Sequence, residues 1–142
     1  MTRLNVLKLV YLGHSPQLGH HFDIFVDNQQ LLTLLSDFEH QYDPIINGAY
    51  VSAINQQALN SNLTSWGAIF ALFVCNCGDI DCWQCTVNIE CYNDIVCWHN
   101  WDNPSRDWDY RLFPALSFDR PQYLHECEQA LAFLNKPNPV ER

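Results

Sequence analysis

The sequence predicts a single α+β domain spanning residues 1–142, in which an antiparallel sheet of about five strands packs against two helices. Three observations support this prediction: apolar residues alternate between positions 67 and 101, and amphipathic stretches cover about 28–39 and 120–135. The hydrophobic content of 48% is the third, because it is high for a disordered chain. A chain of this length suits one hydrophobic core.

The first predicted elements are two strands and a helix. Residues 4–13 alternate weakly, and residues 21–27 place three apolar side chains on one face, which favours strands. Asp27 then begins the run D-N-Q-Q, which we interpret as a capping box that starts a helix over about 28–39. Residues 41–65 are rich in Asn, Gln, Ser, Pro and Gly and predict a loop that could include one short helix.

The second half predicts a meander of three strands, at residues 66–75, 85–92 and 95–101. Asn93 and Asp94 form the turn between the last two, since both residue types tolerate a positive φ. A long aromatic loop follows. Asp119 with Gln122 is a second capping-box pattern, and the helix it starts at about 120–135 is expected to lie across one face of the sheet.

The charge is strongly one-sided. The net charge is −9, and neither Lys nor Arg occurs between Lys8 and Arg106. Ten acids lie in that interval: Asp23, Asp27, Asp37, Glu39, Asp43, Asp79, Asp81, Glu90, Asp94 and Asp102. Such a surface repels nucleic acid and attracts basic partners. The alternative interpretation is that excess acid only keeps the protein soluble.

The N-terminal residues carry no pattern of a secretory signal, and no apolar run reaches the roughly 18 residues of a membrane helix. We therefore expect a soluble, cytoplasmic protein with no membrane partner. Thiols stay reduced in that compartment, so the seven cysteines are not expected to form a disulfide framework.

A cluster of cysteines raises the possibility of a metal site. Cys75, Cys77, Cys82 and Cys85 follow the pattern C-x-C-G-x3-C-x2-C around a turn, and four thiolates could surround one structural zinc ion. The spacing differs from the usual zinc-finger pairs, however, and four ligands from eleven contiguous residues are cramped. Inert packing by buried cysteines and a redox or regulatory role are the alternatives.

Catalytic motifs are absent from the sequence. It contains no nucleophile elbow, phosphate loop, zinc-protease motif or dinucleotide fingerprint. Asp79 and Asp81 could be read as paired carboxylates or Mg²⁺ ligands, but acids are common in solvated turns for backbone reasons alone. The sequence therefore predicts a protein that is not an enzyme.

Four motifs resemble a set of uncharacterised small bacterial proteins. They are C-x-C-G-D-x2-C-W at residues 75–83, V-x-W at 96–98, P-S-R-D-W-D-Y at 104–110 and F-D-R-P-Q-Y at 118–123. The resemblance covers roughly the C-terminal half, and those proteins often have Gly where this chain has Asp81. It implies a shared fold and no mechanism.

In size, acidity and lack of catalytic motifs, the chain is similar to immunity proteins of bacterial toxin systems, including contact-dependent growth inhibition. This similarity implies a cytoplasmic protein that binds a basic toxin domain, often a nuclease, and covers its active site. Acids would speed encounter and aromatics would anchor the partner. The candidate residues are Asp79, Asp81, Asp94, Asp102, Trp83, Trp101 and Trp108. Trp83 and Trp108 could equally be core residues.

Overall fold

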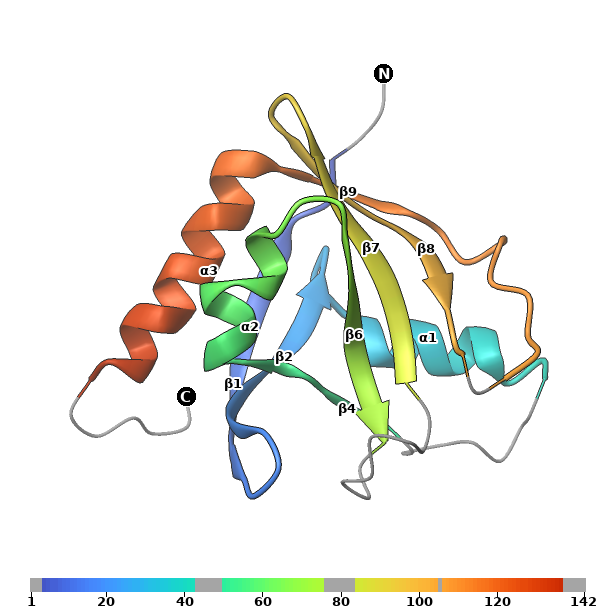
Figure 1. The fold of residues 1–142 in the computed structure, drawn as a ribbon, viewed down its shortest axis with the longest axis horizontal. Helices are drawn as coiled ribbons and strands as arrows, with labels where there is room; N and C mark the ends of the chain where they lie inside the picture. Colours follow the sequence, from blue (N-terminus) through green and yellow to red (C-terminus); the bar gives the residue numbers. More distant parts are fainter. Residues whose placement is uncertain (1–3, 43–49, 76–83, 105, 137–142) are drawn as a thin grey trace.

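The computed structural model describes residues 4–42, 50–75, 84–104 and 106–136, and it confirms the predicted α+β class (Figure 1). No helix within these ranges is long and apolar enough to cross a membrane. The elements in chain order are β1 (Leu7–Ser15), β2 (Gly19–Val26), β3 (Gln29–Gln30), α1 (Leu31–Glu39), β4 (Tyr50–Ser52), β5 (Ile54–Asn55), α2 (Gln56–Asn60), the 3-10 turn η1 (Asn62–Thr64), β6 (Ala68–Cys75), β7 (Gln84–Tyr92), β8 (Ile95–Asp102), β9 (Leu116–Asp119) and α3 (Arg120–Leu134).

The larger sheet has the strand order β4-β6-β7-β8-β9, and all its neighbouring strands are antiparallel. Its centre is the predicted meander, formed by β6, β7 and β8. The turn between β7 and β8 uses Asn93 at φ 57°, a left-handed conformation that asparagine tolerates better than most residues. β9 was not predicted, because its four residues follow a stretch that the sequence marks as a loop.

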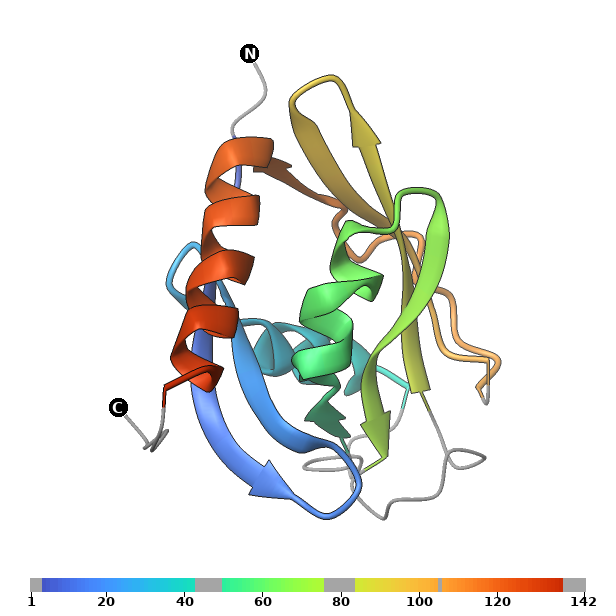
Figure 2. The same ribbon diagram turned by 60° about the vertical axis from the view of Figure 1, so that its left-hand side comes forward.

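The smaller sheet has four strands: β1 pairs with one edge of β2, and the short strands β3 and β5 both pair with its other edge. The two sheets are joined at both margins. At one margin only Ala53 separates β4 of the larger sheet from β5 of the smaller one. At the other margin Asn5, just before β1, forms a parallel bridge with Phe118 of β9. The sheets therefore curl around a shared core (Figures 1 and 2).

The predicted capping box at Asp27 is wrong. Asp27 and Asn28 have φ angles of 53° and 66° and form the turn that joins β2 to β3, so α1 begins only at Leu31. The Asp27 carboxylate accepts hydrogen bonds from the backbone N–H of Val6 (2.8 Å) and from Asn5 Nδ2 (2.7 Å). Asp-Asn also suits a two-residue hairpin turn, and the structure has this turn in place of a helix cap.

The second predicted helix start is confirmed, because Asp119 precedes α3 and accepts a hydrogen bond from the Gln122 N–H (3.2 Å). The Gln122 side chain, however, does not return to Asp119. Its amide accepts from Leu7 N (3.1 Å) and donates to Leu7 O (2.7 Å). One turn later, Glu126 Oε2 accepts from Leu9 N (2.8 Å). Helix α3 thus runs beside β1 and hydrogen-bonds its outer edge (Figure 2).

A single cluster of buried side chains includes residues of both sheets and of α1, α2 and α3. Trp98 of β8 belongs to this cluster and is fully buried. Its indole Nε1 donates to Tyr123 Oη at 3.3 Å, and the Tyr123 hydroxyl donates to Leu63 O at 2.6 Å. These two bonds tie β8, α3 and η1 together inside the core.

Candidate functional site

A hollow of about 470 Å³ lies where β8 ends. Residues 100–102 of β8 form one side, and residues 108–111, 113 and 115 of the following loop form the other. We call it the β8 hollow. It brings together three residues that the sequence predicted for partner binding: Trp101, Asp102 and Trp108.

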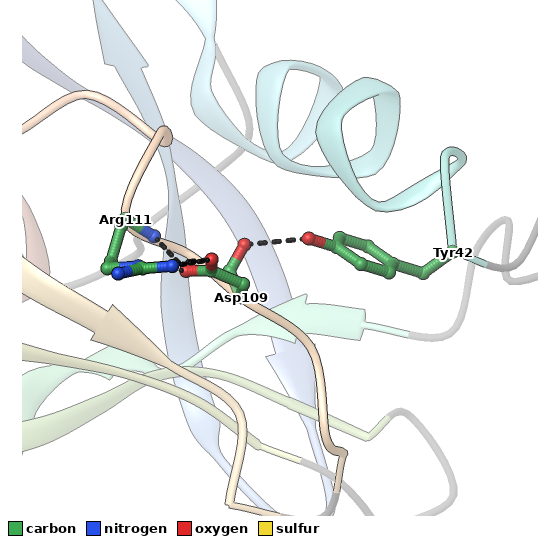
Figure 3. A network of polar contacts seen from close by, with 3 residues as sticks. All are labelled: Tyr42, Asp109 and Arg111. Atoms are coloured by element: carbon green, nitrogen blue, oxygen red, sulfur yellow. Dashed lines mark hydrogen bonds and ion pairs between the residues drawn. The ribbon is translucent and has the colours of Figure 1, made fainter.

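The loop beside the hollow is attached to the C-terminal end of α1. The Tyr42 hydroxyl donates to the backbone carbonyl of Asp109 at 2.9 Å (Figure 3). The Tyr42 ring also stacks on Trp108, with ring centroids 5.4 Å apart and planes 11° from parallel. Arg106 adds a cation–π contact, its guanidinium carbon 5.3 Å from the Trp108 ring centre. Trp108 is therefore half-buried and held between neighbouring side chains.

Asp109 and Arg111 form an ion pair at the rim of the hollow (Figure 3). The Asp109 carboxylate accepts from Arg111 Nε at 3.0 Å, from Nη2 at 2.8 Å and from the Arg111 backbone N–H at 2.9 Å. These bonds lower the pKa of Asp109 to about 2. Because Arg111 is already paired, it does not neutralise the exposed Asp102 or the exposed Asp107.

A buried carboxyl group lies next to the hollow. Glu39, the last residue of α1, is fully buried, and its Oε2 accepts hydrogen bonds from the hydroxyls of Tyr110 and Tyr50. Asn103 Nδ2 donates to the Tyr50 hydroxyl at 2.8 Å. No described residue hydrogen-bonds Glu39 Oε1. Burial raises the pKa of Glu39, and the two tyrosine donors oppose this only in part.

Sequence reasoning missed Glu39 as a site residue. The available signal was its place on α1: it follows Leu31 and Leu35 at intervals of four, so it lies on the buried stripe of the helix. An acid in such a stripe requires hydrogen-bond donors nearby, and the two tyrosines supply them.

Trp101 is not a surface anchor, contrary to the prediction. It is 6% exposed, its ring lies edge-on to Phe113 with centroids 5.0 Å apart, and its Nε1 donates to Pro114 O at 3.1 Å. The reason is an extra residue in β8: Asn100 has φ 60°, and the β7 register shifts there by one residue. Such a bulge reverses the side-chain alternation, so Trp101 turns inward.

The structure also separates Asp94 from Trp101, Asp102 and Trp108. Asp94 lies at the exposed tip of the β7–β8 hairpin, whereas Asp102 lies at the opposite end of β8. At ~3.3 Å per strand residue, the two acids are on the order of 25 Å apart. Figure 1 shows this tip at the top and the loop after β8 at the right. Asp94 therefore does not belong to the β8 hollow.

Five candidate residues lie outside the described ranges: Cys77, Asp79, Asp81, Cys82 and Trp83. Of the four cysteines considered as zinc ligands, only Cys75 and Cys85 lie within the described ranges, and both are buried. Among the residues that the structure describes, no group of three His, Cys, Asp or Glu side chains could hold a metal ion. Burial raises the pKa of the Cys85 thiol well above its ordinary value, and the nearby Glu39 adds to this effect.

The β8 hollow thus combines the exposed Asp102, the Trp108 ring in contact with Tyr42 and Arg106, and the Asp109–Arg111 ion pair. Such a surface can bind a cationic group by charge and an apolar group by contact. Comparison of the chain with protein-family models, curated proteins and solved structures finds no match.

Proposed function

We propose that this chain is a cytoplasmic immunity protein that binds a basic toxin domain, most simply a nuclease, and neutralises it by covering its active site. The observation that supports the proposal is the composition of the β8 hollow, where exposed Asp102 lies beside the half-buried Trp108. Arg111 of the lining is already paired with Asp109, Arg106 lies against the Trp108 ring, and Asp102 and Asp107 add two exposed negative charges.

The distribution of charge along the chain supports the same function. The net charge is −9, and the segment from Lys8 to Arg106 contains no Lys or Arg between its ends. Nucleases carry cationic active sites because they bind phosphate backbones, and an acidic surface speeds the encounter with such a site. Proteins that act in this way need no catalytic group of their own.

The support of Trp108 also fits a binding role. Its ring is stacked on Tyr42, and Tyr42 is itself bonded to the loop backbone. A ring that is already held in place loses little conformational freedom when a partner covers it, which favours affinity. Large aromatic side chains of this kind are frequent among residues that dominate binding energy.

The proposal is tested with the product of the gene adjacent to the one encoding this chain, expressed as a candidate toxin. We expect co-expression of the wild-type chain to restore growth. Asp102→Lys combined with Asp107→Lys should weaken toxin binding by tenfold or more in calorimetry and make the remaining affinity less dependent on salt. The melting temperature should stay unchanged, since both residues are exposed.

The matched control is Asp94→Lys combined with Glu128→Lys, which reverses two charges at the other end of the molecule. It changes the net charge equally and should leave the affinity within about twofold of wild type. Equal losses from both double variants would show that only total charge matters, and a toxin that is not bound at all would refute the proposal.

A further inference from the structure

An apolar groove of about 230 Å³ lies between α1 and the chain segment that leads into β9. Leu34 and Phe38 of α1 are only half-buried there, so the groove is open to a partner. Its lining is apolar throughout: Leu31, Leu34, Phe38, Phe113, Pro114 and Leu116.

The groove adjoins the β8 hollow, because Phe113 lines both depressions. The Phe113 ring lies edge-on to Trp101 on one side, at 5.0 Å between centroids, and to Phe38 on the other, at 5.3 Å. The hydrogen bond from Trp101 to the Pro114 carbonyl fixes the wall between them. The two depressions therefore lie next to each other on either side of Phe113, one of them apolar and the other polar.

Acids border both depressions. Asp37 is exposed and follows Leu34 by three positions on α1, so the two side chains are neighbours on the helix surface. Asp102 lies at the hollow, and the Arg111 guanidinium beside it is held by Asp109. An apolar depression with acidic borders is complementary to a large apolar side chain that has cations on either side.

We propose that the groove and the β8 hollow together bind one basic segment of the partner that carries a large aliphatic side chain. That side chain occupies the groove against Leu34 and Phe113, while flanking Lys or Arg side chains pair with Asp37 and Asp102. This inference rests on the proposed function and names the part of the toxin that is recognised.

The test uses three synthetic heptapeptides and the full-length ¹⁵N-labelled chain. The first has a central leucine with three lysines on each side, the second has serine in place of leucine, and the third has glutamates in place of the lysines. We expect the leucine–lysine peptide to shift the amide resonances of Leu34, Phe38 and Phe113 and to bind at least fivefold more tightly than the serine peptide. The glutamate peptide should not bind.

Two variants separate the apolar contribution from the charge contribution. Leu34→Ser should abolish the preference for leucine over serine, whereas Leu124→Ser, at a half-buried position on α3, should preserve it. Asp102→Lys should weaken both lysine peptides. Amide spectra of each variant report whether it is folded.

The outcomes distinguish this inference from the proposed function. If the leucine and serine peptides bind equally and Asp102→Lys weakens both, the groove is not used and this inference fails, while the charge-based function stands. If a toxin binds the chain but the leucine–lysine peptide shifts no amide of the groove, the inference fails in the same way. If neither lysine peptide nor toxin binds, both fail.

Discussion

The most unusual residue of the structure is Glu39, a carboxyl group with no exposed surface. Two tyrosine hydroxyls donate to one of its oxygens, and burial raises its pKa above the ordinary 4.5. The folded protein therefore holds the Glu39 proton more tightly than the unfolded chain does. By linkage, the stabilisation from this group is fully present below the unfolded pKa and is lost as the pH rises through the folded pKa.

This linkage gives a pH prediction for Glu39→Gln. The glutamine side chain does not ionise, but its oxygen can still accept the hydrogen bonds from Tyr50 and Tyr110. As the pH rises above 4.5, the wild type loses stability and the variant does not, so we expect the variant to become more stable relative to wild type. This difference should stop growing once the pH exceeds the raised pKa of Glu39. Urea unfolding at a series of pH values measures this difference.

Glu39→Ala serves as the control for packing and hydrogen bonding. It leaves both tyrosine hydroxyls without their acceptor, and it should be about 1–3 kcal/mol less stable than Glu39→Gln at every pH, because neither variant ionises at this position. A constant difference between Glu39→Gln and wild type across the pH range would contradict the assignment of a raised pKa.

At the scale of elements, α1 and the loop after β8 behave as one unit. Tyr42 bonds the loop backbone and stacks on Trp108, and Phe38 contacts the rings of Tyr110 and Phe113. The supporting contacts of the β8 hollow therefore come from residues about 70 positions away in sequence. These contacts hold the loop in its conformation before any partner binds.

Substitution of Tyr42 tests this dependence. Tyr42→Phe removes the bond to Asp109 O and keeps the stacking, so it should cost less than about 1 kcal/mol, since Tyr42 is 39% exposed. Tyr42→Ala removes both contacts and should increase hydrogen exchange at residues 106–113 by tenfold or more, while amides of β7 keep their protection. Unchanged exchange in the alanine variant would show that the loop holds its shape without α1.

The contact between α3 and β1 yields a second prediction for an element. Gln122→Ala removes the acceptor of the Leu7 N–H and the donor to the Leu7 carbonyl. We expect a loss of about 1–3 kcal/mol in the free energy of unfolding. Gln129→Ala, at an exposed position of the same helix, should change it by less than about 0.5 kcal/mol. Denaturant unfolding of the two variants compares them directly, and equal effects would contradict a structural role for Gln122.

The elements also show where prediction from sequence succeeds. The meander β6–β8 and helix α3 were predicted, because their apolar periodicity and the Asp119 cap are local signals. β4, β5 and β9 have two to four residues each and form through pairing with distant strands, which no local pattern encodes. Asp27 was misassigned because Asp-Asn suits a helix cap and a hairpin turn equally well.

Prediction of the site was limited by the same physics. The pairing of Asp109 with Arg111 is a local contact between residues two positions apart. The burial of Trp101 depends on the bulge at Asn100, and the role of Glu39 depends on Tyr50 and Tyr110, which are 11 and 71 residues away. Side-chain direction after a bulge and hydrogen bonds across the fold follow from tertiary structure alone.

At the scale of the whole molecule, the two sheets share one core and are linked at both margins, so they should unfold together. The possible metal site concerns this scale as well, because four-cysteine zinc sites often contribute most of the folding energy of the chain that contains them. Cys85 is fully buried, so a zinc ion held there would be shielded from solvent.

Native mass spectrometry of the untagged chain, purified without chelator, tests the zinc alternative. We expect the mass of the metal-free chain, with seven reduced cysteines. The melting temperature should not change when a chelator is added. An additional mass of one zinc ion that is lost on acid denaturation would instead assign Cys75, Cys77, Cys82 and Cys85 to a metal centre. It would favour the alternative function, a small zinc-binding or redox/regulatory module, over the proposed immunity protein.

The outer edge of β1 is a potential site of aggregation if helix α3 is removed. A strand edge with free N–H and C=O groups can pair with the same edge of another copy and start an ordered aggregate. Here the side chains of Gln122 and Glu126 occupy the N–H groups of Leu7 and Leu9. A truncation that removes α3 would uncover this edge together with the apolar side chains beneath the helix. We therefore expect versions that end before Leu134 to be more prone to ordered aggregation than the full-length chain.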